Sequence, residues 1–569
     1  MSGSKKKNTH VGSGKNIPVK EKSAPSQLKW LAIIPLLIIT YLVYSPALKN
    51  SITGWDDSNY ITENNDIREL NSAFIKKCFS PHTGYVMGNY HPITMISYAV
   101  EYKISKLDPK TYHTNNVLLH LINGILVYLF IWLLSGRILV ASITAALFLL
   151  HPMHVESVAW ISERKDLLYC LFEMAALSAY ILYIRKEKSV YYILCFVFFI
   201  LALLSKAMAV AMVGILPLLD FYFNRKLTSA KVILEKIPFL IVGIIAGLVA
   251  IQAQNEFEAI VTTVRPLYDR FLLAGYSYIT YLWKSILPVQ LSTFYDYPPA
   301  GTYSWYIVFP ILSLALLVLA FYSLRKTKKI FFGFMFFTFS IALILQLLPV
   351  GGAMMAERYT YIPYIGIFFL IGEGINYIYQ NRKKQEYKTW YPVVTSALFL
   401  FLIVSCSITN ARCKVWKDTI SIWDDALSKD PNIIKGYGGR GKGYLDKQMY
   451  PEAIRDLNKA LELKTDYSDA YYNRGLANYF LAKQNQDAGN MNDALNYYEL
   501  SIRDNSDAIK YNPKLARAYY NRSGNYFILK KYDEALQDAL KAKELGMEID
   551  QAYLDVLNKN SLPGNNPVQ

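Results

Sequence analysis

Apolar residues of this chain gather into repeated runs of about 20 residues up to residue 410, and the pattern then becomes mixed. A helix of about 20 apolar residues crosses the hydrocarbon core of a bilayer. The pattern therefore predicts an all-α protein with a polytopic membrane domain over residues 30–410 and a soluble domain after it. We count eleven membrane-spanning helices, at residues 30–48, 113–134, 138–154, 166–184, 190–205, 207–223, 237–253, 303–323, 330–348, 359–379 and 390–409.

Basic residues stand in short clusters between these runs, within a chain of net charge +16. The positive-inside rule places such clusters in the cytoplasm. With the flexible basic tail of residues 1–29 inside, alternation of the eleven helices puts residues 185–188, 225–236, 325–329 and 382–388 inside as well. The distribution of the basic clusters therefore indicates the membrane topology, and it argues against a nucleic-acid partner. The soluble domain is expected on the outer side.

The segment 271–287 is apolar enough to cross the membrane, but counting it would place the later basic clusters outside. Arg270 and Lys284 stand at its ends, which is typical of an interfacial or re-entrant helix. We leave it out of the count, although the sequence alone does not decide whether it spans. The long outer loops are then residues 49–112 and 254–302.

The soluble domain contains an internal repeat. The motif Tyr-Gly-Gly-Arg-Gly at residues 437–441 recurs as Tyr-Tyr-Asn-Arg-Gly at 471–475 and as Tyr-Tyr-Asn-Arg-Ser at 519–523. The first interval, 34 residues, is the period of the tetratricopeptide repeat, a pair of helices. Such pairs stack into a solenoid whose concave face binds extended peptides or protein partners. A packing or oligomerisation role is the alternative.

The second interval is longer and predicts about 14 extra residues in the middle repeat. We expect half of them in the turn near residues 484–490 and half in the second helix. Residues 416–427 have the pattern of a leading half-repeat. The repeat domain is therefore assigned to residues 411–555, and residues 556–569 are expected to form a flexible tail.

Ionisable side chains gather where the predicted helices reach the outer surface. Charged groups near lipid are costly and usually serve ion handling, proton transfer or substrate binding. Arginine and lysine there would hold the phosphate of a lipid-linked substrate, and a carboxylate would take the proton of an attacking hydroxyl. The candidates on this face are Asp56, Asp57, His91, His151, His154, Glu156, Arg164, Lys206, Glu357 and Arg358.

Each candidate also has a purely structural interpretation. Adjacent carboxylates such as Asp56 and Asp57 form solvated turns, and Lys206 at a helix end would extend along the apolar surface toward water. His151 and His154 are three residues apart, a spacing that metal ligands share. No third ligand is evident, so we predict no metal site there.

Several motifs occur in one order along the chain: an acidic pair after the first predicted helix, His-Pro-Met-His-Val-Glu at residues 151–156, Lys206, Glu-Arg-Tyr-x-Tyr-x-Pro at 357–363, and the repeats. In this order they resemble the transmembrane and tetratricopeptide repeat-containing (TMTC) protein O-mannosyltransferases of the GT-C glycosyltransferase superfamily. The resemblance covers nearly the whole chain after residue 30. The small repeat set favours a bacterial relative, in the inner membrane with periplasmic repeats; in a eukaryote the resemblance implies the endoplasmic reticulum membrane.

The resemblance implies that a sugar, mannose, moves from a polyprenyl-phosphate donor to a hydroxyl acceptor, protein Ser or Thr, with inversion at the anomeric carbon. It maps the general base onto Asp56 or Asp57 and the donor phosphate ligands onto Lys206, Arg358 and Arg164. His91, His151, His154, Glu156 and Glu357 complete the substrate-site candidates. The sugar, the acceptor, the choice between the two aspartates and any use of a divalent cation stay open at this point.

Two other functions fit parts of the pattern. An O-antigen ligase or polymerase is also polytopic, but its key loop is a long outer one late in the chain, whereas the late outer loop here, 349–358, is short. A membrane-anchored scaffold whose repeats recruit partners would tolerate replacement of the acidic pair and of Lys206. Both remain alternatives to the transferase.

Overall fold

The computed structural model describes residues 33–256, 265–299, 304–345, 347 and 352–561, so the predicted tail 1–29 and residues 562–569 lie outside the described residues. The chain is 79% helical. Within the described ranges the only strands are β1 (Tyr85–Val86) and β2 (Asn89–Tyr90), which pair as an antiparallel hairpin. The predicted all-α class is confirmed.

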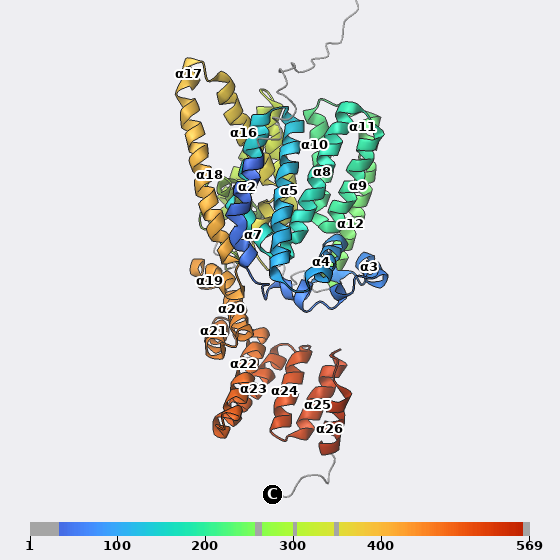
Figure 1. The fold of residues 1–569 in the computed structure, drawn as a ribbon, viewed down its shortest axis with the longest axis vertical. Helices are drawn as coiled ribbons and strands as arrows, with labels where there is room; N and C mark the ends of the chain where they lie inside the picture. The colour runs from blue at the N-terminus through green and yellow to red at the C-terminus, as the bar shows by residue number, and fades with distance from the viewer. Residues whose placement is uncertain (1–32, 257–264, 300–303, 346, 348–351, 562–569) are drawn as a thin grey trace, which may run out of the picture.

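A bundle of long helices forms the first two thirds of the chain (Figure 1). Every predicted membrane segment coincides with a helix. These helices are α2 (Ile34–Tyr44), α5 (Pro109–Ser135), α6 (Ile138–Leu150), α8 (Arg164–Lys186), α9 (Ser189–Ser205), α10 (Met212–Tyr222), α12 (Ile237–Glu256), α14 (Val308–Ser323), α15 (Lys328–Ile341), α16 (Tyr364–Asn381) and α18 (Trp390–Val415).

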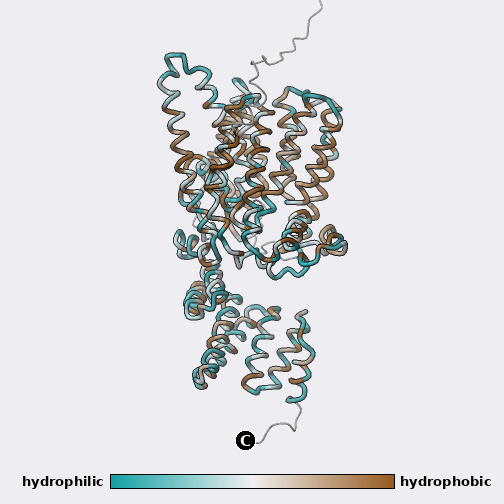
Figure 2. Tube along the Cα trace, viewed as in Figure 1, coloured by the Kyte–Doolittle hydropathy of each residue, from teal (hydrophilic) through white to brown (hydrophobic). Residues whose placement is uncertain are grey.

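The bundle has the surface of a membrane protein. Figure 2 shows apolar residues concentrated on it, whereas the repeats and the ends of the bundle are largely polar. Ile241, Leu314 and Leu400 on its outer helices are more than half exposed. By length and composition alone, five described helices are apolar enough to cross a membrane, and a bent pair in residues 138–159 makes six. The chain is an integral membrane protein; the count of eleven and the orientation remain predictions.

Helix α13 (Leu267–Lys284) corresponds to the segment left out of the count. It packs against α14, and Tyr278 Oη lies 2.7 Å from Thr338 Oγ1 of α15. It is not among the described helices that are long and apolar enough to span. Arg270 near its start donates to the carbonyl of Leu347 (2.7 Å), and Lys284 at its end donates to the carbonyl of Val289 (2.8 Å). The Lys284 end thus contacts the predicted outer loop 254–302, whereas Leu347 falls within the predicted helix 330–348, so the re-entrant assignment stays a prediction.

Short elements cover the end of the bundle that faces the repeats (Figure 1). The loop 49–112 folds into a π-helical turn directly after the acidic pair and then into α3, β1, β2 and α4. π-Helical turns are uncommon and frequent at functional sites. These elements are η1 (Ser45–Lys49), η2 (Ser58–Thr62), η3 (Asp66–Arg68), α3 (Ser72–Phe79), α4 (Pro92–Ser105), η4 (Pro152–His154), α7 (Val155–Ala159), η5 (Ile161–Glu163), η6 (Ala207–Ala211) and η9 (Glu357–Thr360); elsewhere lie α11 (Ala230–Leu234), η7 (Ser304–Ile307), η8 (Ala342–Ile344) and α17 (Gln385–Lys388).

The soluble domain is the predicted stack of helix pairs. The same arginine–aspartate contact recurs in two of the helix pairs: Arg440 forms two hydrogen bonds with Asp456 (2.6 and 2.9 Å), and Arg522 does the same with Asp538 (2.7 and 2.8 Å). Two parallel bonds of this kind fix geometry as well as adding stability. The helices are α19 (Thr419–Lys429), α20 (Ile434–Asp446), α21 (Tyr450–Leu463), α22 (Ser468–Asp487), α23 (Met491–Tyr511), α24 (Ala516–Ile528), α25 (Tyr532–Glu544) and α26 (Gln551–Ser561).

Two details of the repeat prediction were wrong. The flexible tail was expected from residue 556, but residues 556–561 still belong to helix α26. The extra residues near 484–490 lengthen the first helix of the middle pair: α22 has 20 residues, whereas α20 has 13. The turn is made only after Asp487, where Gly489 adopts a positive φ of 81°, a conformation that glycine accepts without strain. The second half of the insertion does extend the second helix, since α23 has 21 residues and α21 has 14.

Candidate functional site

Asp57 of the acidic pair is a buried structural anchor. Its carboxylate accepts hydrogen bonds from the Thr53 amide (3.0 Å) and hydroxyl (2.8 Å), and from the Ser162 amide (2.9 Å) and hydroxyl. Burial raises the pKa of Asp57, and these hydrogen bonds lower it again. With four donors around it, the carboxylate joins the loop 49–112 to the turn before α8 and has little capacity left for substrate.

Asp56 has the opposite environment. It lines a cavity of about 530 Å³ between the bundle and the repeats. Within the described residues its carboxylate forms no hydrogen bond or ion pair. Burial raises the pKa of Asp56; the positive charge of Lys165 lowers it and the negative charge of Glu163 raises it again. Of the two aspartates, Asp56 is therefore the one that a substrate can reach.

Three cations converge on Glu163 beside this cavity. Glu163 is 1% exposed, and its carboxylate lies 3.0 Å from Lys165 Nζ, 3.7 Å from Lys206 Nζ and 3.3 Å from Arg358 Nε. The cations come from the start of α8, the end of α9 and η9. The tertiary structure thus brings together Lys206 and Arg358, which are 152 residues apart in sequence. We call Lys165, Lys206 and Arg358 the cation cluster.

Arg358 is the member of the cation cluster that lines both the cavity with Asp56 and the pocket with Lys206. Its backbone amide donates to Glu156 (2.9 Å), and its guanidinium pairs with the same carboxylate. The guanidinium also lies over the rings of Trp160 (5.4 Å) and Tyr359 (4.9 Å). Arg358 lines the cavity that holds Asp56 and also a narrow pocket with Lys206. It therefore connects the candidate base with the rest of the cation cluster.

Arg164 lies outside this site. It is 2% exposed and donates to Asn116 Oδ1 (2.7 Å) and to the carbonyl of Tyr112 (2.8 Å), while its guanidinium pairs with Glu101. These contacts fasten α4 and α5 to the start of α8. Sequence reasoning chose Arg164 and missed Lys165, its neighbour. Successive residues of a helix point about 100° apart, so only one of the two faces the site.

His91 borders the site as a neutral group. It is 2% exposed and packs against the ring of Tyr60, with 5.2 Å between ring centres. Within the described residues its Nε2 atom has no hydrogen-bond partner. Burial lowers the pKa of His91 to about 3, and the charges of Lys165 and Lys206 act in the same direction. The imidazole therefore offers a neutral polar atom and no charge for a phosphate.

His151 and His154 belong to the core of the bundle. Both are fully buried and contact the rings of Tyr361, Tyr364 and Phe368. Across the described ranges no three His, Cys, Asp or Glu side chains are grouped to hold a metal ion. These two histidines pack aromatic side chains rather than facing the cavity.

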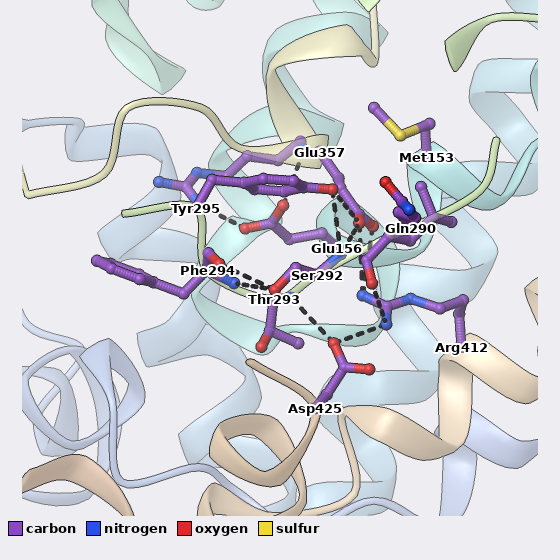
Figure 3. Close-up of polar contacts among 12 residues, drawn as sticks. Met153, Glu156, Gln290, Ser292, Thr293, Phe294, Tyr295, Glu357, Arg412 and Asp425 are labelled. Atoms are coloured by element: carbon purple, nitrogen blue, oxygen red, sulfur yellow. Dashed lines mark hydrogen bonds and ion pairs between the residues drawn. The ribbon is translucent and has the colours of Figure 1, made fainter. Parts of the chain in front are cut away.

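Glu357 connects the site with the repeat domain (Figure 3). Its buried carboxylate accepts from the Ser292 amide (2.8 Å) and the Tyr295 hydroxyl (3.1 Å), and Arg412 Nη2 lies 3.5 Å away. Arg412 also pairs with Asp425 of α19 (2.8 Å). Burial raises the pKa of Glu357 to about 7, with Arg412 acting against it. The network fixes α18, α19 and the loop before Tyr295 to η9, which carries Arg358.

Stacked indoles form one wall of the cavity beside Asp56. Trp55 stacks on Trp160 with 4.8 Å between ring centres, and Trp160 stacks on Trp416 at 5.3 Å. Trp423 of α19 lies 5.1 Å from Trp55. The residue before the candidate base is thereby held by the bundle and by the leading repeat helix together.

The opposite wall comes from the first helices of the repeats. It includes Lys435, Gly438, Gly439 and Lys442 of α20, Asp469, Tyr472 and Asn473 of α22, and Arg517 of α24. The repeat spacing places Lys435, Asp469 and Arg517 at equivalent positions. First helices line the inner face of such a solenoid, so that face looks toward Asp56.

The TPR repeat family matches residues 441–481. The chain is 25% identical over 407 residues to protein O-mannosyl-transferase F38B6.6 of Caenorhabditis elegans, covering 67% of the chain and 54% of that protein. The homologues that this chain matches are TMTC protein O-mannosyltransferases. Mouse TMTC3 is 22% identical over 68% of the chain and 46% of its own length, and human TMTC1 is 22% identical over 76% and 55%.

The chain thus spans about half the length of the TMTC proteins that it matches. Two solved structures cover 75% of it. They are an Archaeoglobus fulgidus oligosaccharyltransferase tethered with an acceptor peptide (13% identity, 59% of that chain, TM-score 0.40) and ArnT from Cupriavidus metallidurans bound to undecaprenyl phosphate (12%, 80%, TM-score 0.38). These likenesses are too distant to assign a fold, so the GT-C architecture stays a prediction.

Proposed function

We propose that this protein is a GT-C glycosyltransferase that moves a sugar, mannose, from a polyprenyl phosphate to a Ser or Thr hydroxyl of a protein on the outer face of the membrane. The observation that carries the proposal is the position of Asp56. Among the residues that the structure describes, its carboxylate has no hydrogen-bond or ion-pair partner, and it lies in a cavity bounded by Arg358 on one side and by the repeats on the other. The similarity to the TMTC O-mannosyltransferases supports the sugar and the acceptor class.

In the proposed reaction the acceptor hydroxyl oxygen attacks the anomeric carbon of the donor. A bond forms between these two atoms while the bond from that carbon to the phosphate oxygen breaks. The hydroxyl proton passes to Asp56, and the polyprenyl phosphate leaves with both electrons of the broken bond. One displacement of this kind inverts the anomeric carbon. A carboxylate whose pKa is raised by burial is a stronger base than an exposed one.

The cation cluster is assigned to the donor phosphate. In the described part of the chain Arg358 uses Nη1 and Nε for its two carboxylates, which leaves Nη2 for a ligand. Lys206 likewise pairs with Asp166 and Glu163 and has a third N–H to donate. Because Glu156, Glu163 and Asp166 offset the three cations, the cluster and these carboxylates together are nearly neutral. A phosphate group gains the spare donors, and its charge grows in the transition state, where such donors count most.

The location of the site agrees with a lipid-linked donor. The cation cluster lies where α8, α9 and η9 reach the repeat-facing end of an apolar bundle. A polyprenyl chain would stay in the bilayer while its phosphate meets the cluster. We assign this end to the periplasm of a bacterium, or to the lumen of the endoplasmic reticulum in a eukaryote.

The test compares Asp56→Asn with Asp57→Asn in the purified protein, using a lipid-phosphate sugar and a Ser/Thr peptide. Loss of a general base typically costs about 10²- to 10⁴-fold in rate. We expect that loss for Asp56→Asn, with the melting temperature unchanged. Full transfer by a folded Asp56→Asn protein would overturn the mechanism, and an absence of transfer by the unaltered protein with mannose donors would overturn the assigned sugar.

A further inference from the structure

Two lysines of the cavity wall carry unpaired positive charge. Lys435 is exposed and Lys442 is half-buried, and both line the cavity that holds Asp56. Within the described residues neither forms an ion pair with a carboxylate. Burial raises the pKa of Asp296 and of Asp446, and the nearby charges of Lys435 and Lys442 act against that rise without direct contact.

The other charges of the wall do not cancel this excess. Arg517 and Asp469 face each other at 3.9 Å and offset one another. Asp56 is the remaining carboxylate of the lining, and it lies on the bundle side. The repeat side of the cavity therefore attracts anionic groups, and it does so through flexible side chains that a bound chain can engage.

Between the two lysines, α20 itself contributes only glycines to the wall. Gly438 and Gly439 both line the cavity. A Cβ at Gly438 would lie 2.9 Å from Tyr467, and one at Gly439 would lie 2.2 Å from Trp423 Nε1. Each glycine within a helix costs roughly 1 kcal/mol relative to alanine. The close packing of the Tyr467 and Trp423 rings requires the two glycines, and these rings form the surface between the lysines.

The spacing of the lysines matches an extended peptide. Lys435 and Lys442 are seven residues apart, which is about two turns or roughly 10.5 Å along a helix. A chain extended in the polyproline II conformation advances about 3.1 Å per residue and presents every third side chain on the same side. A peptide that runs along α20 therefore meets the two charges about three residues apart.

We propose that the acceptor is an extended peptide with acidic side chains three residues apart and the modified Ser or Thr between them, held by Lys435 and Lys442 against Gly438 and Gly439. The proposal rests on the proposed function, since it names the acceptor of that site. It also makes α20 the element that selects the acceptor, through charge on either side of the hydroxyl that meets Asp56.

Binding of fluorescent peptides to the full-length protein, in detergent and without any sugar donor, tests the proposal. Three peptides share one sequence, Ala-X-Ser-Ala-X-Ala, with X as Asp, Asn or Lys. Exposed ion pairs contribute up to about 1 kcal/mol each, so we expect the Asp peptide to bind about tenfold more tightly than the Asn peptide at low salt. Since salt screens such pairs, the preference should shrink at high salt.

Variants assign the effect to the two lysines. The double variant Lys435→Ala/Lys442→Ala should bind the Asp and Asn peptides equally. The double variant Lys435→Glu/Lys442→Glu should instead prefer the Lys peptide. Lys510→Ala, an exposed lysine on α23 outside the cavity, is the control with the preference retained. Equal binding of the Asp and Asn peptides by the unaltered protein would overturn the proposal. If the protein prefers the Asp peptide but transfers no sugar, only the proposed function is refuted, because the binding assay needs no donor.

Discussion

Asp57 accepts hydrogen bonds from both the amide and the hydroxyl of Ser162, a residue 105 positions later in the chain. This contact closes the loop 49–112 onto the turn before α8. Asp56, one residue earlier, is left facing the cavity. A long-range structural bond thus decides the direction of the adjacent carboxylate, and the acidic pair divides into an anchor and a reactive group.

We predict that Asp57→Asn destabilises the protein. An amide at this position turns one acceptor into a donor opposite buried N–H and O–H groups, which costs about 1 to 3 kcal/mol. Ser162→Ala should have a smaller effect in the same direction, and the two changes should be non-additive because they share one contact. Thermal unfolding in detergent measures this. Asp56→Asn is the matched control, and an equal drop in its melting temperature would contradict the distinction.

Arg164 and Lys165 should respond differently to removal of their charge. Arg164→Leu leaves Glu101 buried without its partner, and breaking a buried pair typically costs about 3 to 5 kcal/mol. We expect a loss of folded protein. Lys165→Met should yield folded protein with a lowered transfer rate. Size-exclusion chromatography and a transfer assay separate the outcomes. A stable Arg164→Leu protein that no longer binds the donor would indicate that Arg164 is a ligand of the donor phosphate.

The transfer rate should depend on pH through Asp56. A general base acts when deprotonated, so the rate falls as the pH drops through its pKa. Burial raises the pKa of Asp56, and Lys165 lowers it. Lys165→Met therefore raises the pKa further and moves the acidic limb of the profile to higher pH. Rate profiles of both proteins between pH 4 and 9 check the sign, and an unshifted limb would argue against coupling between these two groups.

Stability should fall as the pH rises through the titration of Glu357. Burial raises the pKa of Glu357 to about 7 in the folded protein, whereas an unfolded glutamate titrates near 4.3. Between these values the folded state holds the proton that the unfolded state has lost, so stability decreases with increasing pH. Glu357→Gln should remove this contribution. Melting temperatures between pH 4.5 and 7.5 for both proteins measure it, and identical slopes would contradict it.

Much of the architecture could be read from local patterns. The apolar runs correspond to helices in every case, and the 34-residue interval identifies the repeats. The turn in the middle repeat was misplaced because residues 484–487 are polar but still compatible with a helix, and only Gly489 ends it. The end of the helix is therefore set by the backbone conformation of Gly489 and not by the polarity of the residues before it.

The candidate site was only half predictable. Lys206, Arg358 and Asp56 were proposed because each stands at, or shortly after, the predicted outer end of an apolar run. Arg412 and Asp425 were missed, since their link to Glu357 joins α18 and α19 to η9. Nothing in the local sequence of Arg412 distinguishes it from a basic residue that ends a membrane helix.

The sequence by itself determined the helical class, the membrane bundle and the repeats, because helix period, apolar length and repeat interval are local properties. The tertiary structure alone decided which member of each adjacent pair serves the site. Neighbouring side chains point in different directions, and contacts with distant residues, Ser162 for Asp57 and Glu101 for Arg164, fix those directions. Asp56 faces the cavity and Lys165 pairs with Glu163 beside it, whereas their neighbours Asp57 and Arg164 are bound elsewhere.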